Sequence, residues 1–119
     1  MIKKGEVWKV DLEPTKGTEI KKIRSCVIIS TNRLNKWNMR FVVVPLTTKK
    51  PDKTYAFEVP IFFNKCHGKV ICDQIRTVDE SRLQKKQGTL TLTEMNAIHE
   101  KLLLIFDLWD YLKEKFSVS

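Results

Sequence analysis

The 119-residue chain has few of the residue types that mark whole classes of protein. It contains three cysteines, two histidines, four glycines and four prolines. Its apolar runs are all shorter than the ~18–20 residues needed to cross a membrane. The first ten residues, MIKKGEVWKV, lack the apolar segment of a secretory signal. We therefore expect a cytoplasmic protein without a membrane partner.

The few cysteines and histidines do not form a metal-binding pattern. Cys26 and Cys72 lie inside apolar runs, as buried free thiols do. Cys66, His67 and Cys72 come closest to a zinc ligand set, but no second pair completes four ligands. His99 lies within a helical pattern, where a structural role is expected. The sequence therefore predicts neither a metal ion nor a cofactor.

The short motifs of three common enzyme classes are also missing. The chain has no G-x-x-x-x-G-K-[ST], no G-x-G-x-x-G and no H-E-x-x-H. These absences argue against nucleotide hydrolysis at a P-loop, dinucleotide redox chemistry and zinc proteolysis.

Positive charge is abundant. Lysine and arginine number 22 against 14 acidic residues, which gives a formal net charge of +8. Such an excess on a small chain predicts a polyanionic partner, most often a nucleic acid, although solubility alone is the alternative. The length suits one domain over residues 1–119, and 42% hydrophobic residues can supply its core.

The first part of the chain has the patterns of short β-strands. Trp8, Val10 and Leu12 alternate with polar residues, whereas two later runs rich in β-branched residues suggest strands buried on both faces. Pro45 requires the third strand to end, or lie at an edge, by Thr47. The predicted strands are 5–12, 26–29, 41–44, 55–61 and 69–75. Such a series is typical of a small barrel or sandwich.

The end of the chain has a helical pattern. Thr91-x-x-Glu94 is a capping box, and an apolar stripe follows it. The stripe comprises Met95, Ile98, Leu102, Ile105, Trp109 and Leu112. Residues 102–106 are apolar nearly all round, which predicts burial by the barrel and by a second subunit. A second capping box, Thr77-x-x-Glu80, predicts a short turn over 78–83.

Three polar segments are candidates for function. Residues 13–24 and 47–54 are basic loops, and the segment CDQIRTVDESRL, residues 72–83, follows an apolar run. A solvated charge run would explain any one of them. Their coexistence in one small basic chain favours phosphate binding.

These segments, in order, resemble a known family. GEVWKVDLEPTKGTEIKKIR, VIIS, VVVPLTT and CDQIRTVDESRL, followed by a glycine and a helix, are similar to the MazF/PemK toxins of bacterial toxin–antitoxin systems. The resemblance extends from about Gly5 to Gly88. It implies a mainly β fold, an SH3-like small β-barrel of the CcdB/PemK type with C-terminal helices, and a homodimer.

The resemblance also implies an activity and partners. The activity is that of an mRNA interferase, a metal-independent endoribonuclease that cuts single-stranded RNA at short sequences. The protein partner is an antitoxin whose disordered tail folds over the RNA groove, and DNA is contacted only through the antitoxin complex. Without a metal, the RNA 2′-hydroxyl must attack the adjacent phosphate, giving a 2′,3′-cyclic phosphate and a 5′-hydroxyl. Arginine suits stabilisation of the phosphate charge because its planar fork matches phosphate oxygens.

The family motifs place functional roles on particular residues. Arg24 and Thr47 match the catalytic pair of the MazF branch, with Arg24 stabilising charge and Thr47 positioning the phosphate. Glu19 matches an acidic loop position and would orient Arg24 or accept a proton. The remaining substrate-binding candidates are Lys16, Thr48, Lys49, Asp73, Gln74 and Arg76. Gln74 would read a base edge, whereas Arg76 would hold a phosphate or stack on a base.

Each of these assignments has a structural alternative. Thr47 would otherwise be a strand-end residue and Arg24 a member of a surface ion pair. Gln74 and Arg76 would otherwise cap the end of a strand ladder, with an Arg76–Asp79 pair. Asp79 itself, like Arg82, is read as structural.

The sequence departs from the family pattern at three places. Thr18 and Ile71 stand where the PemK branch has functional histidine and arginine residues, and Ser25 replaces the usual proline. The acid–base arrangement of that branch therefore does not transfer, and the general base stays open.

Two other functions fit the same pattern. A CcdB-like toxin of the same fold would poison gyrase through its C-terminal helix, which is apolar here. A non-catalytic RNA-binding module would use the basic loops alone, with an affinity that falls steeply with salt.

Overall fold

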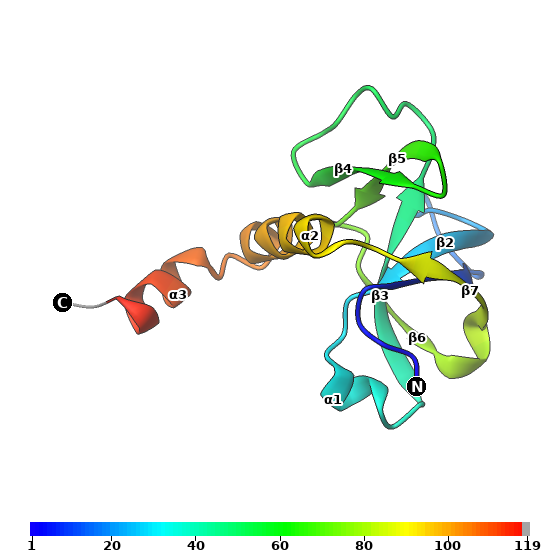
Figure 1. Cartoon of the computed structure of the whole chain (residues 1–119), viewed down its shortest axis with the longest axis horizontal. Helices are drawn as coiled ribbons and strands as arrows, with labels where there is room; N and C mark the ends of the chain where they lie inside the picture. Colours follow the sequence, from blue (N-terminus) through cyan, green and yellow to red (C-terminus); the bar gives the residue numbers. More distant parts are fainter. Residues whose placement is uncertain (118–119) are drawn as a thin grey trace.

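The computed structural model describes residues 1–117, which form a curved antiparallel sheet followed by two C-terminal helices (Figure 1). The strands are β1 (Glu6–Asp11), β2 (Ile23–Ile28), β3 (Arg40–Thr47), β4 (Glu58–Phe63), β5 (Cys66–Ile71), β6 (Arg76–Asp79) and β7 (Leu83–Thr89). The helices are α1 (Asn32–Asn35), the 3₁₀ helix η1 (Glu80–Arg82), α2 (Leu92–Ile105) and α3 (Trp109–Phe116). The predicted mainly β fold with a C-terminal helix is confirmed.

The sheet curls around β3. Its strand order is β4-β5-β3-β2-β1-β7, and β6 pairs with β3 outside this path. The first half of β3 pairs with β6, whereas Leu46 and Thr47 pair with β5. One strand therefore belongs to both parts of the sheet, and β3 ends at Thr47 as Pro45 predicted.

The core lies on both faces of the central strands. Val7, Val27 and Val44 belong to one buried cluster, which α2 covers with Met95 and Ile98. A second cluster on the other face includes Val10, Cys26, Ile28, Phe41 and Val43. The strands are buried on both faces, as their β-branched runs predicted.

The structure corrects two predicted strands. The predicted strand 55–61 begins only at Glu58, because Glu58 closes a turn with Tyr55 through backbone and side-chain hydrogen bonds. The predicted strand 69–75 is β5, which begins at Cys66 and stops at Ile71. The elements α1, β6 and β7 were not predicted from the sequence.

The capping box predicted at Thr77 is wrong. Thr77 lies within β6 and pairs with Val42. Asp79 caps η1 instead, since its carboxylate accepts a hydrogen bond from the Ser81 N–H at 2.9 Å. Asp79 thus has the structural role predicted for it.

The capping box at the start of α2 is confirmed, but the predicted single helix is two. Thr91 and Glu94 exchange both hydrogen bonds of the box. The helix ends in a Schellman motif, in which Asp107 adopts φ 55° and Leu108 donates to the Leu103 carbonyl. The axis therefore changes direction before α3, which extends away from the sheet (Figure 1).

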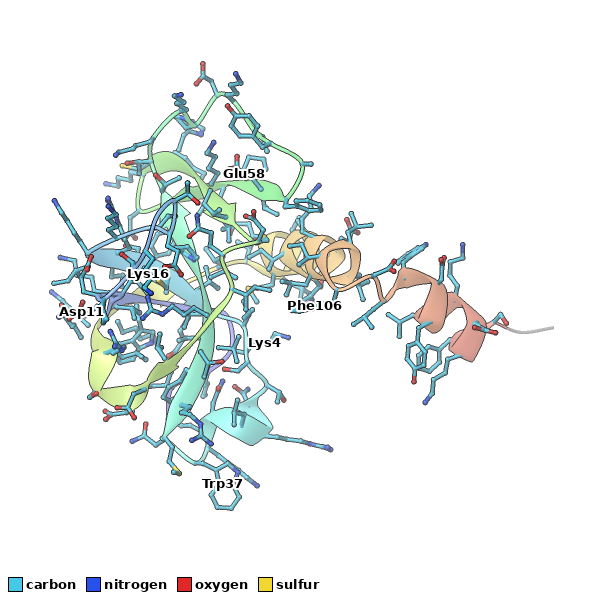
Figure 2. The ribbon with its side chains drawn as sticks, turned by 180° about the vertical axis from the view of Figure 1, so that it is seen from behind. Lys4, Asp11, Lys16, Trp37, Glu58 and Phe106 are labelled. Atoms are coloured by element: carbon cyan, nitrogen blue, oxygen red, sulfur yellow. The ribbon has the colours of Figure 1, made fainter. Side chains whose placement is uncertain are left out.

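The C-terminal helices leave much apolar surface exposed. Leu102 and Ile105 pack against the core, whereas Leu104 and Phe106 are more than half exposed. Phe106 lies at the end of α2 (Figure 2). Within residues 1–117, no helix has the length and apolar character to span a membrane.

Candidate functional site

The β2–β3 pairing brings Arg24 and Thr47 together. Cys26 faces Pro45 and Val27 faces Val44. Continuing this antiparallel register toward the strand ends places Arg24 opposite Thr47. Arg24 is the second residue of β2, just after the first loop, residues 12–22, and Thr47 is the last residue of β3, just before the second loop, residues 48–57.

Arg24 and Thr47 line two neighbouring cavities. The hairpin cavity, about 300 Å³, lies against the β4–β5 hairpin and is lined also by Lys9, Ser25, Phe63 and Gln87, among others. The loop cavity, about 330 Å³, lies under the first loop and is lined also by Glu19, Lys21, Lys22 and Lys49, among others. The two residues therefore form the shared rim of both cavities.

The Arg24 side chain is held at one atom and free at the others. Its Nε donates to the Lys21 carbonyl at 3.1 Å. Within residues 1–117 its two terminal amino groups have no hydrogen-bond partner, and no carboxylate forms an ion pair with it. The guanidinium thus has its fork available for an anion, and the surface ion-pair alternative has no support in this part of the chain.

Thr47 has a hydroxyl that can donate. Its Oγ1 accepts a hydrogen bond from the Lys49 N–H at 3.1 Å, which leaves the hydroxyl proton for another acceptor. Gly68 makes the position close-packed, because an added Cβ there would lie 2.8 Å from the Thr47 carbonyl oxygen. Only glycine lets β5 approach Thr47 this closely.

The charges around the rim suit a phosphate. The loop cavity is lined by Lys21, Lys22, Arg24 and Lys49, with Glu19 as its only acidic residue. The hairpin cavity is lined by Lys9 and Arg24 and by no acidic residue. Several cations around one opening create the positive potential that attracts a polyanion.

Glu19 is occupied within its own loop. Its carboxylate accepts a hydrogen bond from the Lys16 N–H, and its own N–H donates to the Lys16 carbonyl at 3.1 Å. Glu19 lines the loop cavity, but no ion pair in residues 1–117 joins it to Arg24. Lys16 is exposed and lines neither cavity. Thr48 lines the hairpin cavity.

Gln74 holds the first loop instead of facing solvent. Its Oε1 accepts from the Ile20 N–H at 2.9 Å, and its Nε2 donates to the Thr18 carbonyl at 3.4 Å. Both ends of its amide are therefore used by loop backbone. Asp73 beside it is exposed, with no side-chain hydrogen bond in residues 1–117. Asp73, Gln74 and Arg76 all line a third cavity of about 490 Å³, which adjoins the loop cavity at Glu19 and its two neighbours.

Two arginines hold the start of the same loop. Arg76 donates to the Leu12 carbonyl, and Arg82 donates to the carbonyls of Asp11 and Glu13. Arg82 is structural, as predicted. The Arg76–Asp79 pair of the alternative interpretation does not occur in residues 1–117. The polar segment after β5 therefore affects the site indirectly, because its side chains hold the first loop in place.

The sequence analysis missed the residues that hold the second loop. Lys69 is buried, forms an ion pair with Glu58 at 2.8 Å and donates to the Lys53 carbonyl at 2.8 Å. Its ammonium also lies 5.1 Å from the centre of the Tyr55 ring. A lysine inside the apolar run Gly68–Cys72 was the only signal for this arrangement.

Glu58 has a perturbed pKa. Burial acts to raise it, but the hydrogen bond and charge of Lys69, together with the Tyr55 N–H, outweigh burial and lower the pKa of Glu58. Charged Glu58 is thus the stable form at the start of β4, directly after the second loop, where Figure 2 labels it.

The cysteines lie as predicted. Cys26 and Cys72 are buried, and burial raises the pKa of each thiol to about 12. Cys66 is exposed at the start of β5. No three histidine, cysteine or carboxylate side chains of residues 1–117 gather as metal ligands.

The chain is similar in sequence to proteins of a known family. Residues 3–106 match the family model described as the PemK-like, MazF-like toxin of type II toxin–antitoxin systems. The endoribonuclease MazF9 of Mycobacterium tuberculosis is 33% identical over 118 residues, covering 92% of this chain and 99% of that protein.

Solved structures extend the comparison to the fold. A mycobacterial endoribonuclease in complex with its cognate antitoxin is similar with a TM-score of 0.75 and 26% identity, covering 91% of this chain and 97% of the other. MazF from Deinococcus radiodurans has a TM-score of 0.77 at 21% identity, covering 89% and 96%. The second likeness concerns the fold alone.

Proposed function

The chain belongs to the PemK/MazF family of toxins from type II toxin–antitoxin systems, and from this premise we propose that it is an endoribonuclease of the cytoplasm that cuts single-stranded RNA at short sequences. The observation that carries the proposal is the meeting of Arg24 and Thr47 on one positively charged rim. Neither residue is near the other in sequence, and both have hydrogen-bond donors free for a phosphate.

The proposed reaction uses the substrate's own nucleophile. The 2′-oxygen loses its proton to a base and forms a bond to the adjacent phosphorus, while the bond from phosphorus to the 5′-oxygen breaks. The departing oxygen takes up a proton, so the products end in a 2′,3′-cyclic phosphate and a 5′-hydroxyl. No water is consumed in this step.

Arg24 and Thr47 act on the phosphate in this proposal. The two free amino groups of Arg24 bind the non-bridging oxygens as negative charge develops on them. The Thr47 hydroxyl donates to the same phosphate, because its oxygen already accepts from the Lys49 backbone. Both donors are in place before the substrate arrives, which is how such groups lower a barrier.

The other predicted residues divide into two groups. Thr48 and Lys49 are proposed to contact the RNA directly and Glu19 to lie beside it, since all three line the cavities, with Lys16 and Asp73 at the periphery. Gln74 and Arg76 are proposed to act through the first loop, since their side chains bind its backbone.

We propose that the working form is a homodimer. The bend between α2 and α3 exposes apolar side chains that a second copy of the chain would cover: Leu104, Phe106, Leu108, Trp109, Tyr111 and Phe116. An antitoxin is the proposed inhibitor, because the mycobacterial relative is described in complex with one. Its tail would cover the rim, and DNA would be bound through that antitoxin.

The test is RNA cleavage in EDTA with mapping of the product ends. Wild-type protein should cut a mixed-sequence RNA and leave the predicted ends. Arg24→Ala should be slower by about 10²–10³-fold, the usual effect of removing one preorganised donor. Arg33→Ala is the matched control, since Arg33 is exposed on α1 and lines neither cavity.

Other outcomes would favour other functions. Equal cutting by Arg24→Ala would remove Arg24 from the mechanism. Salt-sensitive RNA binding without any product would indicate a non-catalytic binding module. Stabilised gyrase cleavage with intact RNA would indicate the CcdB-like alternative.

A further inference from the structure

The hairpin cavity extends beyond Arg24 and Thr47, and its far walls have no role in the proposed reaction. Four strands contribute to these walls: Lys9 from β1, Ser25 from β2, Phe63 from β4 and Gln87 from β7. Gly68 on β5 leaves the floor open beside Thr47. These residues are distant in sequence, so the cavity is a product of the fold.

The cavity has the size and the walls of a site for one small flat group. Its volume of about 300 Å³ is at the lower end of the ~300–1,000 Å³ found for small-molecule sites. Phe63 supplies an aromatic wall, and Leu46 and Ile61 supply apolar surface. Single-stranded RNA is recognised when an unstacked base lies on an aromatic ring and its edge is hydrogen-bonded.

The aromatic wall is held in place by close packing. An added Cβ at Gly88 would lie 2.8 Å from the Phe63 ring, so the ring rests directly on the β7 backbone. Gln87, the next residue, lines the same cavity. The Phe63 ring therefore packs against the β7 backbone at the residue next to Gln87.

The polar wall presents hydrogen-bond donors. The Ser25 hydroxyl donates to Gln87 Oε1 at 2.6 Å, which uses the acceptor of that amide. The Gln87 amide nitrogen has no partner in residues 1–117 and keeps two donor hydrogens. Lys9 also lines the cavity and no carboxylate does, whereas Asn64 of the β4–β5 turn adds an amide that can donate and accept. At Gln87 itself, where only donors remain free, a base edge that offers carbonyl oxygens fits better than an edge that offers an amino group.

We propose that the hairpin cavity binds the unstacked base of a nucleotide next to the cleaved phosphate, and that it selects the keto bases uracil and guanine. This inference rests on the proposed endoribonuclease activity. Gln87 is the residue that sets the choice of base, Phe63 supplies stacking, and Ser25 fixes the Gln87 amide. Arg24 and Thr47 at the rim connect the base site to the scissile phosphate.

The experiment is cleavage of a random-sequence RNA pool followed by sequencing of the cut sites. Wild-type protein should prefer uracil or guanine at one nucleotide flanking the cut. Gln87→Glu keeps the size and the Ser25 hydrogen bond but replaces donors with acceptors. It should reduce the keto preference at that nucleotide by roughly 10- to 100-fold, the discrimination that a good side-chain–base pair provides.

Two further variants make the result specific. Gln84→Glu adds the same charge to an exposed residue of β7 that does not line the cavity, and its cut-site profile should match wild type. Phe63→Leu should slow cutting at all sites without changing the preferred base, because stacking does not depend on the base edge. A Gln87→Glu profile equal to that of Gln84→Glu would overturn the inference.

The inference and the proposed function fail in different ways. If wild-type protein cuts RNA only where adenine or cytosine lies on both sides of the cut, that result would overturn the proposed base site but leave the proposed endoribonuclease activity in place. If wild-type protein leaves RNA intact, NMR titration with uridine and adenosine 3′-monophosphates can still measure binding of each nucleotide to the cavity. A shift of the Gln87 side-chain amide with uridine but not adenosine then supports the base site, and equal responses overturn it.

Discussion

The two basic loops that flank the candidate site are alike in charge and differ in how they are held. The first loop, residues 12–22, and the second loop, residues 48–57, each carry three lysines. The first is held from outside by Gln74, Arg76 and Arg82, whose side chains bind its backbone. The second is held from beneath by the buried Lys69–Glu58 pair.

The two loops therefore position the two sides of the candidate site, Arg24 and Thr47, by different kinds of contact. Arg24 follows the first loop directly, and Thr47 precedes the second. A hydrogen bond contributes about 0.5–1.5 kcal/mol, or about 1.5–3 kcal/mol where one partner is charged, so the first loop depends on several separate contacts. A buried ion pair is different, because removing one partner leaves a charge without compensation. The second loop should therefore depend on one sensitive contact.

The largest effect is expected from breaking the buried pair. Lys69→Met fills the same space but leaves Glu58 buried without its partner, and the loss of unfolding free energy should be about 3–5 kcal/mol in urea denaturation. The side chains of Lys69 and Glu58 are only 6% and 14% exposed, so solvent screens the pair little.

The matched control for this prediction is the other ion pair of the described chain. Lys86 binds Glu6 at 3.0 Å, but the Lys86 side chain is 49% exposed. Its partner Glu6 is buried, but the Glu6 carboxylate also accepts hydrogen bonds from the Lys3 N–H and the Trp8 indole N–H. Because these donors remain, Lys86→Met should cost only about 1 kcal/mol. Equal losses for the two variants would show that the Lys69–Glu58 pair is no more sensitive than a pair with one exposed member.

Most of the fold could be predicted from the strand patterns of the sequence. Part of the site could be predicted from residues close together in the chain. The runs at 26–29 and 41–44 and the capping box at Thr91 predicted elements that the structure contains, because each depends on short-range periodicity or chemistry. The strand β7, with its pattern LQKKQGT, has no apolar alternation, and only pairing with β1 makes it a strand.

The missed part of the site depends on contacts between distant segments. Gln74 binds residues more than fifty positions earlier, and Ser25 meets Gln87 across β1. The residue types of Gln74 and Arg76 indicated a functional segment, but the side-chain direction decides whether they meet substrate or loop. The direction of these side chains cannot be predicted from the spacing of residues within the segment 72–83.

An intermediate effect is expected from releasing the first loop. Gln74→Leu leaves the Ile20 N–H and the Thr18 carbonyl without their partners. Because Gln74 is half-buried, the loss of unfolding free energy should be about 1 kcal/mol, the lower end of the range for unsatisfied polar groups. RNA cleavage should slow by up to about 10²-fold, since the loop leads to Arg24 and a small misplacement is costly.

Asp73→Asn is the control for the first loop. Asp73 is exposed and makes no side-chain hydrogen bond in residues 1–117, so the unfolding free energy should change by no more than about 0.5 kcal/mol. Faster amide exchange at Ile20 in Gln74→Leu, and not in Asp73→Asn, checks the cause. A larger loss of cleavage in Asp73→Asn, with unchanged stability, would place the segment 72–83 in contact with RNA.

The smallest effect is a change with pH that should appear at the second loop and not at the first. The pKa of Glu58 is lowered in the folded state from its ordinary value of 4.5, so the unfolded chain binds its proton first as the pH falls. The stability that charged Glu58 contributes is present above pH 4.5 and is lost as the pH falls through the folded pKa. The loss of unfolding free energy caused by Glu58→Gln, measured in urea from pH 7 downward, should therefore shrink below pH 4.5.

The control is Gln74→Leu, whose loss of unfolding free energy should stay constant over the same range, because an amide bound to backbone does not titrate. A cost of Glu58→Gln that is independent of pH would mean that the ion pair does not stabilise the folded state, and the second loop would then be held, like the first, by hydrogen bonds that do not titrate in this range.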